Sequence, residues 1–288
     1  MKRYQSKKEY EPEVLKRLHE VQVEILNDFI RTCDKHNLKY FAVYGTALGA
    51  VRHQGFIPWD DDIDVGMLRE DYYRFFEVFE EELGHKYTLL TPEIDERYAC
   101  TVTHIQKKGT KFISEDSQDL KCERGIFMDI FPYDYIADSN KARRKQELAT
   151  LFWGKLLFLS GTAYPYIPIE GIIGRLAGLV CILIHGVLTL LNVSPKTLYR
   201  QYLKHAKTYN TKGSKKYITS FENPGAVKNK IYEDDMYPFQ KVKFESTEIY
   251  IPANNHEIMT SIYGDYMQLP PKDKRVNHRP LVIDFGDN

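Results

Sequence analysis

Four carboxylates fall within five consecutive positions of the sequence, at Asp60, Asp61, Asp62 and Asp64 in the run WDDDIDV. Like charges at this spacing repel one another, so the run is costly unless a positive charge lies among them. If residues 62–67 form a strand, Asp62 and Asp64 point to one face while their apolar neighbours enter the core. Two such carboxylates suit a hard cation such as Mg²⁺, which usually binds one or two carboxylates and substrate phosphates. We expect Asp62 and Asp64 to be metal ligands, whereas a solvated acidic turn explains Asp60 and Asp61 equally well.

A further acid, Asp129, stands alone in the apolar run GIFMDIF, residues 125–131. A buried charge without a partner is unfavourable, so such a group either pairs or shifts its pKa. A cation held by Asp62 and Asp64 would be a suitable partner for Asp129. A salt bridge to a nearby Arg or Lys is the alternative.

The segment Tyr44-Gly45-Thr46 lies where a short apolar strand should give way to a short helix. Glycine permits close approach of the backbone to a ligand, and a helix N-terminus presents free N–H groups to phosphate. We therefore expect Gly45 and Thr46 to bind phosphate, with Thr46 capping the helix. Arg52 and His53, at the end of the same helix, either bind phosphate or pair with Asp60 or Asp61.

Other basic and aromatic residues are weaker candidates. Arg124 precedes the strand that carries Asp129, and a basic tail near the C-terminus could reach an anionic acceptor or simply face solvent. Tyr44 and Trp59 could stack on a base or hold a quaternary ammonium by cation–π attraction, although plain packing explains either ring. The basic tail comprises Lys272, Arg275, His278 and Arg279.

Local patterns predict the elements that would position these residues. Apolar residues at spacings of three and four indicate an amphipathic helix over residues 13–36. A hairpin is predicted around Lys107-Lys108-Gly109, and Ser194-Pro195 is a favourable helix start. Further strands are expected at 38–44, 62–67 and 125–131, and helices at 46–53, 71–83, 138–159, 194–209 and 253–263.

Composition limits the class of protein. The chain has 288 residues, with 40 Lys plus Arg balanced by 40 Asp plus Glu, so its formal net charge is zero. This balance disfavours a general nucleic-acid binder held by a basic surface. Aromatic residues make up 13% of the chain, which suits a protein that handles sugars, bases or a membrane interface. The length fits one α/β or α+β domain with insertions, or two small domains.

The sequence predicts a cytoplasmic location. The start, residues 1–13, is charged and lacks the apolar stretch of a secretory signal. The four cysteines, Cys33, Cys100, Cys122 and Cys181, are scattered, and reduced thiols explain them better than disulfides or zinc ligation. The apolar segment 176–193 is long enough to approach a membrane span, but we favour a buried or membrane-surface helix.

Gly-Thr, then Asp-x-Asp, then a lone Asp on a later strand is the pattern of the nucleotidyltransferase superfamily. The sequence match is more specific than this general pattern. Residues 44–67 closely resemble the signature of the LicD family of phosphotransferases, with the sequence YGTALGAVRHQGFIPWDDDIDVGM. GIFMDIFPYD (125–134) and YGDYMQLPP (263–271) also resemble later blocks of that family. The resemblance is weakest over residues 140–230.

The resemblance implies an α+β fold of nucleotidyltransferase type, with a mixed β-sheet flanked by helices. The chain would then be a single domain, 1–288, with a helical and partly apolar insertion at 138–210. By position, Asp62, Asp64 and Asp129 match the family's metal-binding and catalytic acids. Mg²⁺, or Mn²⁺ in its place, would be the cofactor.

The resemblance also implies a reaction. Such enzymes move phosphocholine, or a similar phospho-substituent, from a CDP-linked donor such as CDP-choline to a hydroxyl. The acceptor would be a cell-surface glycan, such as a teichoic acid or lipopolysaccharide, or its lipid-linked precursor, and nucleic acid is not expected as a partner. The segment 176–193 would make a peripheral contact with the inner face of the cell membrane.

Two alternatives remain open at this stage. One is a nucleotidyltransferase that moves the NMP group itself and releases pyrophosphate rather than CMP. The other is a non-catalytic, membrane-associated binding protein on the same scaffold. The presence of Asp62, Asp64 and Asp129 together argues against the second alternative.

Overall fold

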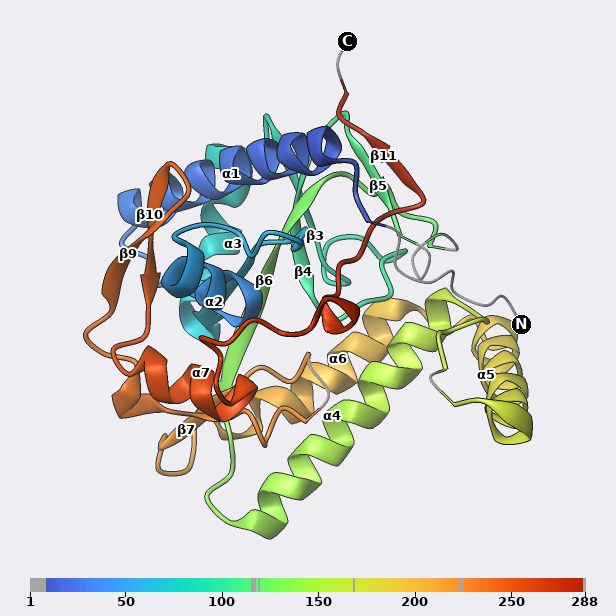
Figure 1. The fold of residues 1–288 in the computed structure, drawn as a ribbon. Helices are drawn as coiled ribbons and strands as arrows, with labels where there is room; N and C mark the ends of the chain where they lie inside the picture. The colour runs from blue at the N-terminus through green and yellow to red at the C-terminus, as the bar shows by residue number, and fades with distance from the viewer. Residues whose placement is uncertain (1–8, 115–117, 119, 168, 223–224, 287–288) are drawn as a thin grey trace.

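A mixed sheet forms the centre of the fold (Figure 1). The computed structural model describes residues 9–114, 118, 120–167, 169–222 and 225–286, so most of the charged start lies outside the description. The strand order is β1, β2, β6, β4, β3, and β7 pairs with both β6 and β8. Strands β2 and β6 are parallel, whereas the other pairs of this sheet are antiparallel. The strands are β1 Phe41–Ala42, β2 Asp64–Leu68, β3 Tyr87–Leu90, β4 Thr103–Lys107, β6 Phe127–Tyr135, β7 Tyr217–Thr219 and β8 Ile231–Tyr232.

Two long helices, α1 (Pro12–Lys35) and α3 (Arg69–Leu83), pack on the central strands and on each other. The predicted helix over residues 13–36 is confirmed, and its apolar stripe is the buried face. Phe29 of α1 meets Phe75 of α3 edge to face, with ring centroids 5.2 Å apart. Burial of this apolar stripe is what holds the long helix against the sheet.

The short helix α2 (Tyr44–His53) follows β1 and leads toward the carboxylates. It begins earlier than predicted, because Val43 rather than Thr46 is the N-cap residue. The Thr46 hydroxyl accepts a hydrogen bond from the backbone N–H of Asp64 at 2.8 Å instead. The expectation that Thr46 caps the helix is therefore wrong, since its side chain fastens the start of β2.

A run of three helices lies between β6 and β7, where the helical insertion at 138–210 was expected. These helices are α4 (Asn140–Gly161), α5 (Gly171–Leu190) and α6 (Pro195–Ala206). The Ser139 and Ser194 hydroxyls cap α4 and α6 by accepting backbone N–H groups of the first turns. Helices α4 and α6 pack together over a second apolar cluster that includes Leu157, Leu198 and Tyr202.

Helix α5 lies at the edge of the molecule beyond α4 (Figure 1). It has a mean hydropathy of 2.0 over an 18-residue window, yet only 6% of that window is buried, and it is long and apolar enough to cross a membrane. Gly174 is its only buried residue. The His185 ring Nδ1 lies 2.7 Å from the Leu159 carbonyl and ties α5 to α4. The alternative of a buried helix is thus wrong, because the apolar side chains face outward.

The remaining elements close the fold around this core. The predicted hairpin is wrong in its pairing, because β5 (Lys111–Ile113) pairs with the C-terminal strand β11 (Val282–Asp284) and not with β4. Strands β9 (Gln240–Phe244) and β10 (Thr247–Ile251) form a separate hairpin. All four cysteines are free, as expected. The last helix is α7 Asn255–Tyr263, and 3₁₀ turns lie at Lys207–Tyr209, Glu233–Asp235 and Lys272–Lys274.

Candidate active site

One row of polar residues crosses three adjacent strands of the sheet. Asp64 on β2 is the register partner of Asp129 on the parallel strand β6, and Asp129 is the register partner of His104 on β4. Register partners lie on the same face of a sheet, so the three side chains belong to one surface. The sheet therefore brings together two of the predicted acids, which are 65 positions apart in the sequence.

Burial makes this row electrostatically unfavourable in the absence of a cation. The pKa of Asp64 is raised well above its usual value, first by burial and then by the charges of Asp62 and Asp129. The pKa of Asp129 is raised in the same way, by burial and then by Asp62. Both carboxyl groups are therefore harder to ionise than an exposed acid unless a cation lies beside them.

Asp129 also has an oxygen that the fold leaves unsatisfied. Among the described residues, its Oδ1 atom is buried and has no hydrogen-bond partner. The Nε2 atom of His104 is 3.2 Å away, but burial and then the charge of Arg124 lower the pKa of His104 well below its usual value. A neutral imidazole cannot offset the carboxylate charge, so this oxygen is free to coordinate a cation.

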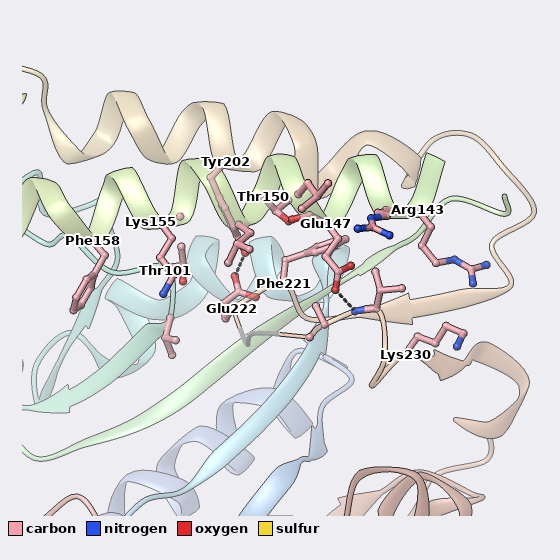
Figure 2. Close-up of a pocket in the computed structure, with 18 of the residues that line it drawn as sticks. Thr101, Arg143, Glu147, Thr150, Lys155, Phe158, Tyr202, Phe221, Glu222 and Lys230 are labelled. Atoms are coloured by element: carbon pink, nitrogen blue, oxygen red, sulfur yellow. Dashed lines mark hydrogen bonds between the residues drawn. The ribbon is translucent and has the colours of Figure 1, made fainter. Parts of the chain in front are cut away.

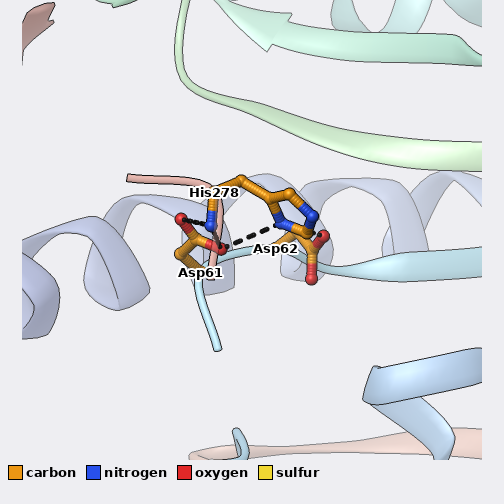
Figure 3. Close-up of side chains that lie close together, drawn as sticks. All are labelled: Asp61, Asp62 and His278. Carbon is orange, nitrogen blue, oxygen red and sulfur yellow. Dashed lines mark hydrogen bonds and ion pairs between the residues drawn. The ribbon is translucent and has the colours of Figure 1, made fainter. Parts of the chain in front are cut away.

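A second cluster joins Asp61 and Asp62 to His278 of the C-terminal segment (Figure 3). The side chain of Asp61 is fully buried and accepts hydrogen bonds from the Tyr10 hydroxyl at 2.7 Å and from the His278 backbone N–H at 2.9 Å. The His278 Nδ1 atom is 3.3 Å from Asp61 and 3.5 Å from Asp62. The solvated-turn interpretation is therefore wrong for Asp61, because its buried carboxylate binds both ends of the described chain through Tyr10 and His278.

The charge of this second cluster depends on the histidine. The hydrogen bond with Asp61 and the charges of Asp62 and Asp60 raise the pKa of His278 to about 9, so it is a cation at neutral pH. Burial raises the pKa of Asp62 to about 6 and that of Asp60 to about 8, and these two carboxyl groups hydrogen-bond to each other. At neutral pH the Asp60 carboxyl group therefore holds a proton and the His278 imidazole is charged, whereas Asp62 is mostly ionised.

Both clusters open into one cavity of about 210 Å³. Asp62 and His278 line it from one side, and His104 and Asp129 line it from the sheet. Arg124 also lines it, so the cavity contains positive as well as negative side chains. The predicted ligands Asp62 and Asp129 therefore line the same cavity, while Asp64 lies beside Asp129 in the row.

These residues fit a divalent metal ion by the nature of their donor atoms. Mg²⁺ and Mn²⁺ prefer carboxylate oxygens, and a bound cation would offset the burial that raises the pKa of these carboxyl groups. The unsatisfied Oδ1 atom of Asp129 is available as a further metal ligand. Among the described residues, the three acidic or histidine side chains already within 4.8 Å of one another are Asp61, Asp62 and His278. Metal binding by Asp62, Asp64 and Asp129 stays a prediction.

The predicted phosphate-binding residues lie at two ends of α2. Gly45 faces the acids, because a Cβ atom at this position would lie 2.5 Å from the Asp60 carboxylate. Arg52, at the other end, donates to the His53 ring at 2.9 Å and to the Tyr266 carbonyl at 2.6 Å. The positive partner recorded for Asp61 is His278 rather than Arg52 or His53.

Sequence reasoning underestimated the C-terminal segment. His278 was expected only within a basic tail, yet it contacts two acids, and the Arg275 guanidinium lies 4.3 Å from the ring centre of Trp59. His104 and Tyr10 were missed altogether. Local sequence holds no signal for Tyr10 or His278, while the position of His104 on a predicted strand, residues 99–106, was a signal that could have been used.

Comparison with known proteins identifies a family domain within the chain. Residues 37–150 match the family described as LicD/FKTN/FKRP, nucleotidyltransferase domain. The chain is 29% identical over 270 residues to the lipopolysaccharide cholinephosphotransferase LicD of Haemophilus influenzae, covering 90% of this chain and 93% of that protein. An uncharacterised protein of Rickettsia typhi is 42% identical over 65 residues, 22% of this chain and 21% of that protein. Another, of Rickettsia prowazekii, is 34% identical over 93 residues, 31% of this chain and 35% of that protein.

The matched region contains Gly45, Thr46, Asp62, Asp64 and Asp129, whereas His278 lies beyond it. The similarity to the Haemophilus protein continues past this region, since it covers 90% of the chain. The resemblance seen in the motifs is thus confirmed, and the chain carries a LicD-family domain over residues 37–150.

Proposed function

We propose that this protein is a Mg²⁺-dependent transferase on a nucleotidyltransferase-like fold. It moves phosphocholine, or a similar phospho-substituent, from a CDP-linked donor to a hydroxyl of a cell-surface glycan or its lipid-linked precursor. The observation that carries the proposal is the pairing of Asp64 with Asp129 across parallel strands, beside a cavity that Asp62 also lines. Similarity over 90% of the chain to a lipopolysaccharide cholinephosphotransferase supports the choice of substrates.

The chemistry requires positioning and charge neutralisation more than covalent help from the protein. The acceptor oxygen forms a bond to the phosphorus of the phosphocholine group. The bond from that phosphorus to the bridging oxygen breaks, and CMP leaves with the bonding electron pair. The proton of the acceptor hydroxyl passes to a carboxylate, for which Asp129 is the candidate because it lies in the cavity. CDP-choline and the acceptor thus give the phosphocholine ester, CMP and one proton.

Each part of the site has a role in this proposal. Asp62, Asp64 and Asp129 would hold the divalent cation, which would supply positive charge for the diphosphate. The His278 imidazolium binds phosphate oxygens from the opposite side of the cavity. Gly45 and Thr46 offer backbone N–H groups at the start of α2 to a donor phosphate. Arg52 and His53 lie one helix length away, where they would contact the nucleotide.

We also propose that the enzyme works at the cytoplasmic face of a membrane through α5. Nine large aliphatic side chains of this helix are exposed, and they cover one broad side of it. The opposite side of α5 packs on α4, which His185 helps to fix. A broad apolar surface, with Arg175 near its start as its one exposed charge, suits the boundary between the headgroups and acyl chains of a bilayer, and it would hold the cavity close to a lipid-linked acceptor. The nine residues are Ile172, Ile173, Leu176, Leu179, Val180, Ile182, Leu183, Val187 and Leu190.

The direct test is product identification. The protein is incubated with a panel of CDP-alcohols, Mg²⁺ and candidate glycan acceptors, and nucleotide products are quantified. The proposal predicts CMP, and Asp64→Asn should lower the rate by about 100-fold or more while remaining folded. Release of pyrophosphate from a nucleoside triphosphate would instead support NMP transfer. Normal turnover by folded Asp64→Asn would defeat the proposed mechanism.

A further inference from the structure

A second and larger cavity, of about 700 Å³, runs beside α4 (Figure 2). One wall is a face of α4 on which lining residues recur every three or four positions, from Asn140 to Phe158. The other wall is made of residues 100–102, which precede β4, and of the connection between β7 and β8. We call this cavity the α4 groove. Phe158 is eighteen residues along the helix from Asn140, or about 27 Å, so the groove suits an extended ligand.

The α4 groove joins the 210 Å³ cavity lined by Asp62 and Asp129, which we call the carboxylate cavity, at one end. Cys100, Val102 and Phe158 line both cavities. Figure 2 shows Phe158, Lys155 and Thr101 together at this end, with Lys230 at the opposite end. A ligand lying in the groove could therefore extend into the space occupied by Asp129 and Asp62.

A glycine keeps the groove open near this junction. Gly154 lies within α4, where glycine costs about 0.5–1 kcal/mol relative to alanine. A Cβ atom here would lie 3.8 Å from the side chains of both Thr101 and Tyr202, which is ordinary contact distance. Alanine would therefore fit without strain, whereas a larger side chain would fill the gap between α4 and the opposite wall.

The α4 groove has exposed basic side chains, and its acidic side chains are engaged in hydrogen bonds within the protein. Arg144 and Lys155 are exposed side chains on α4, and Lys230 lies on the opposite wall. Arg143 also lines the groove, but its guanidinium donates to the Ala137 and Asp138 carbonyls and so has a structural role. The acids of the groove, Glu147 and Glu222, accept hydrogen bonds from Val227 and from Tyr202 and Ser220.

The distant cations indicate which substrate the groove takes. Arg144 is fourteen residues along α4 from Phe158, or about 21 Å. A CDP-linked donor carries both of its phosphates at the reacting bond, so these charges lie at the carboxylates during the reaction. Cations at the far end of the groove are therefore too distant to pair with the phosphates of the CDP-linked donor. They suit an anionic group on the acceptor, and Phe158 and Phe221 offer rings on which sugars could pack.

We propose that the α4 groove binds the acceptor as an extended anionic saccharide and directs its hydroxyl past Gly154 into the carboxylate cavity. This inference rests on the proposed function for the identity of the reaction. It adds a binding site, outside the predicted acids, for a defined class of ligand: an oligosaccharide that bears phosphate or carboxylate groups remote from the reacting hydroxyl.

The test uses charge reversal at the far end of the groove. Arg144→Glu combined with Lys230→Glu is compared with Lys145→Glu, which changes a neighbouring exposed cation of α4 that does not line the groove. With phosphorylated core oligosaccharide from lipopolysaccharide as acceptor, the double variant should raise the acceptor KM at least about tenfold, with the KM for CDP-choline unchanged. A rise in the KM for CDP-choline instead would identify the groove as a donor site and overturn the proposal. Equal acceptor KM values in the double variant and Lys145→Glu would also overturn it.

A second pair of variants tests the passage itself. Gly154→Leu should abolish transfer to the oligosaccharide, whereas Gly154→Ala should retain it and unfold at a slightly higher temperature. Direct titration of the same oligosaccharide into Asp64→Asn protein separates this inference from the proposed function, because binding needs no turnover. If Asp64→Asn protein binds the oligosaccharide tightly and the Asp64→Asn, Gly154→Leu double variant does not, the acceptor groove is supported even if the protein catalyses a different reaction. Binding that Gly154→Leu leaves intact would overturn it.

Discussion

Asp64 and Asp129 are register partners on the parallel strands β2 and β6. Burial raises the pKa of each, and each side chain lies among other acids. Like charges are expensive to bury, so this pairing is retained at a cost to stability that a bound cation would relieve. Asp62 and His278 complete the cavity from outside the sheet.

The Thr46 hydroxyl is predicted to hold the start of β2 in place. Thr46→Val removes the acceptor for the buried Asp64 N–H, which should lower the free energy of unfolding by about 1–3 kcal/mol. Thr46→Ser keeps the hydroxyl and is the matched control. Urea denaturation of both variants measures the difference. If Thr46→Val is as stable as Thr46→Ser, the Asp64 backbone does not depend on this hydrogen bond.

Asp61 is predicted to anchor the C-terminal segment. Asp61→Ala removes the acceptor for the His278 N–H and the Tyr10 hydroxyl, so the segment should detach more often. Trypsin cleavage after Arg275 should become roughly tenfold faster. Asp265→Ala, at an exposed acid, is the control. Equal cleavage rates in the two variants would show that Asp61 does not restrain the segment.

Glu222 is predicted to make stability depend on pH. Burial raises its pKa from the usual 4.5 to about 7, so between these values the folded protein holds a proton that the unfolded chain releases. Its contribution to stability therefore falls as the pH rises through this window. The unfolding free energy of Glu222→Gln relative to wild type should increase by about 1–3 kcal/mol from pH 4.5 to pH 8.

Thermal or chemical unfolding across this pH range checks the Glu222 prediction. Glu248→Gln, at an exposed position on β10, provides a control for the loss of one carboxylate. A constant difference between Glu222→Gln and wild type would mean that Glu222 ionises equally in the folded and unfolded states.

Helix α5 is predicted to bind lipid bilayers. Leu179, Leu183 and Leu190 lie along one side of the helix and are more than half exposed. Changing all three to Ser should weaken co-sedimentation with vesicles of anionic phospholipid at least about 100-fold. The matched control changes three exposed aliphatic residues outside the helix, Ile94, Leu269 and Leu281, to Ser. Wild-type protein that stays in the supernatant would contradict membrane docking.

Local patterns in the sequence predicted most helices and the position of the acids. The apolar period predicted α1, and the isolated charge of Asp129 within an apolar run indicated a special environment. The start of β2 was predicted two residues early, because the hydrogen bond from Asp64 to Thr46 connects residues 18 positions apart. Local patterns do not encode such a contact.

The remaining parts of the site depend on longer-range contacts. The pairing of β5 with β11 and the approach of His278 to Asp61 join residues that are more than 160 positions apart. The α4 groove arises where α4 meets two loops that are distant in the chain. The exposure of α5 could not be predicted from the sequence either, since an apolar helix of this length is equally consistent with burial.

The central claim is that Asp62, Asp64 and Asp129 share one divalent cation. Calorimetric titration of Mg²⁺ and Mn²⁺ into wild-type protein and Asp129→Asn tests it most directly. The account predicts that wild-type protein binds the ion and that Asp129→Asn weakens binding at least about tenfold. The variant should also unfold at the same or a higher temperature, because it removes a buried acid. Equal affinity in a folded Asp129→Asn protein would contradict the account.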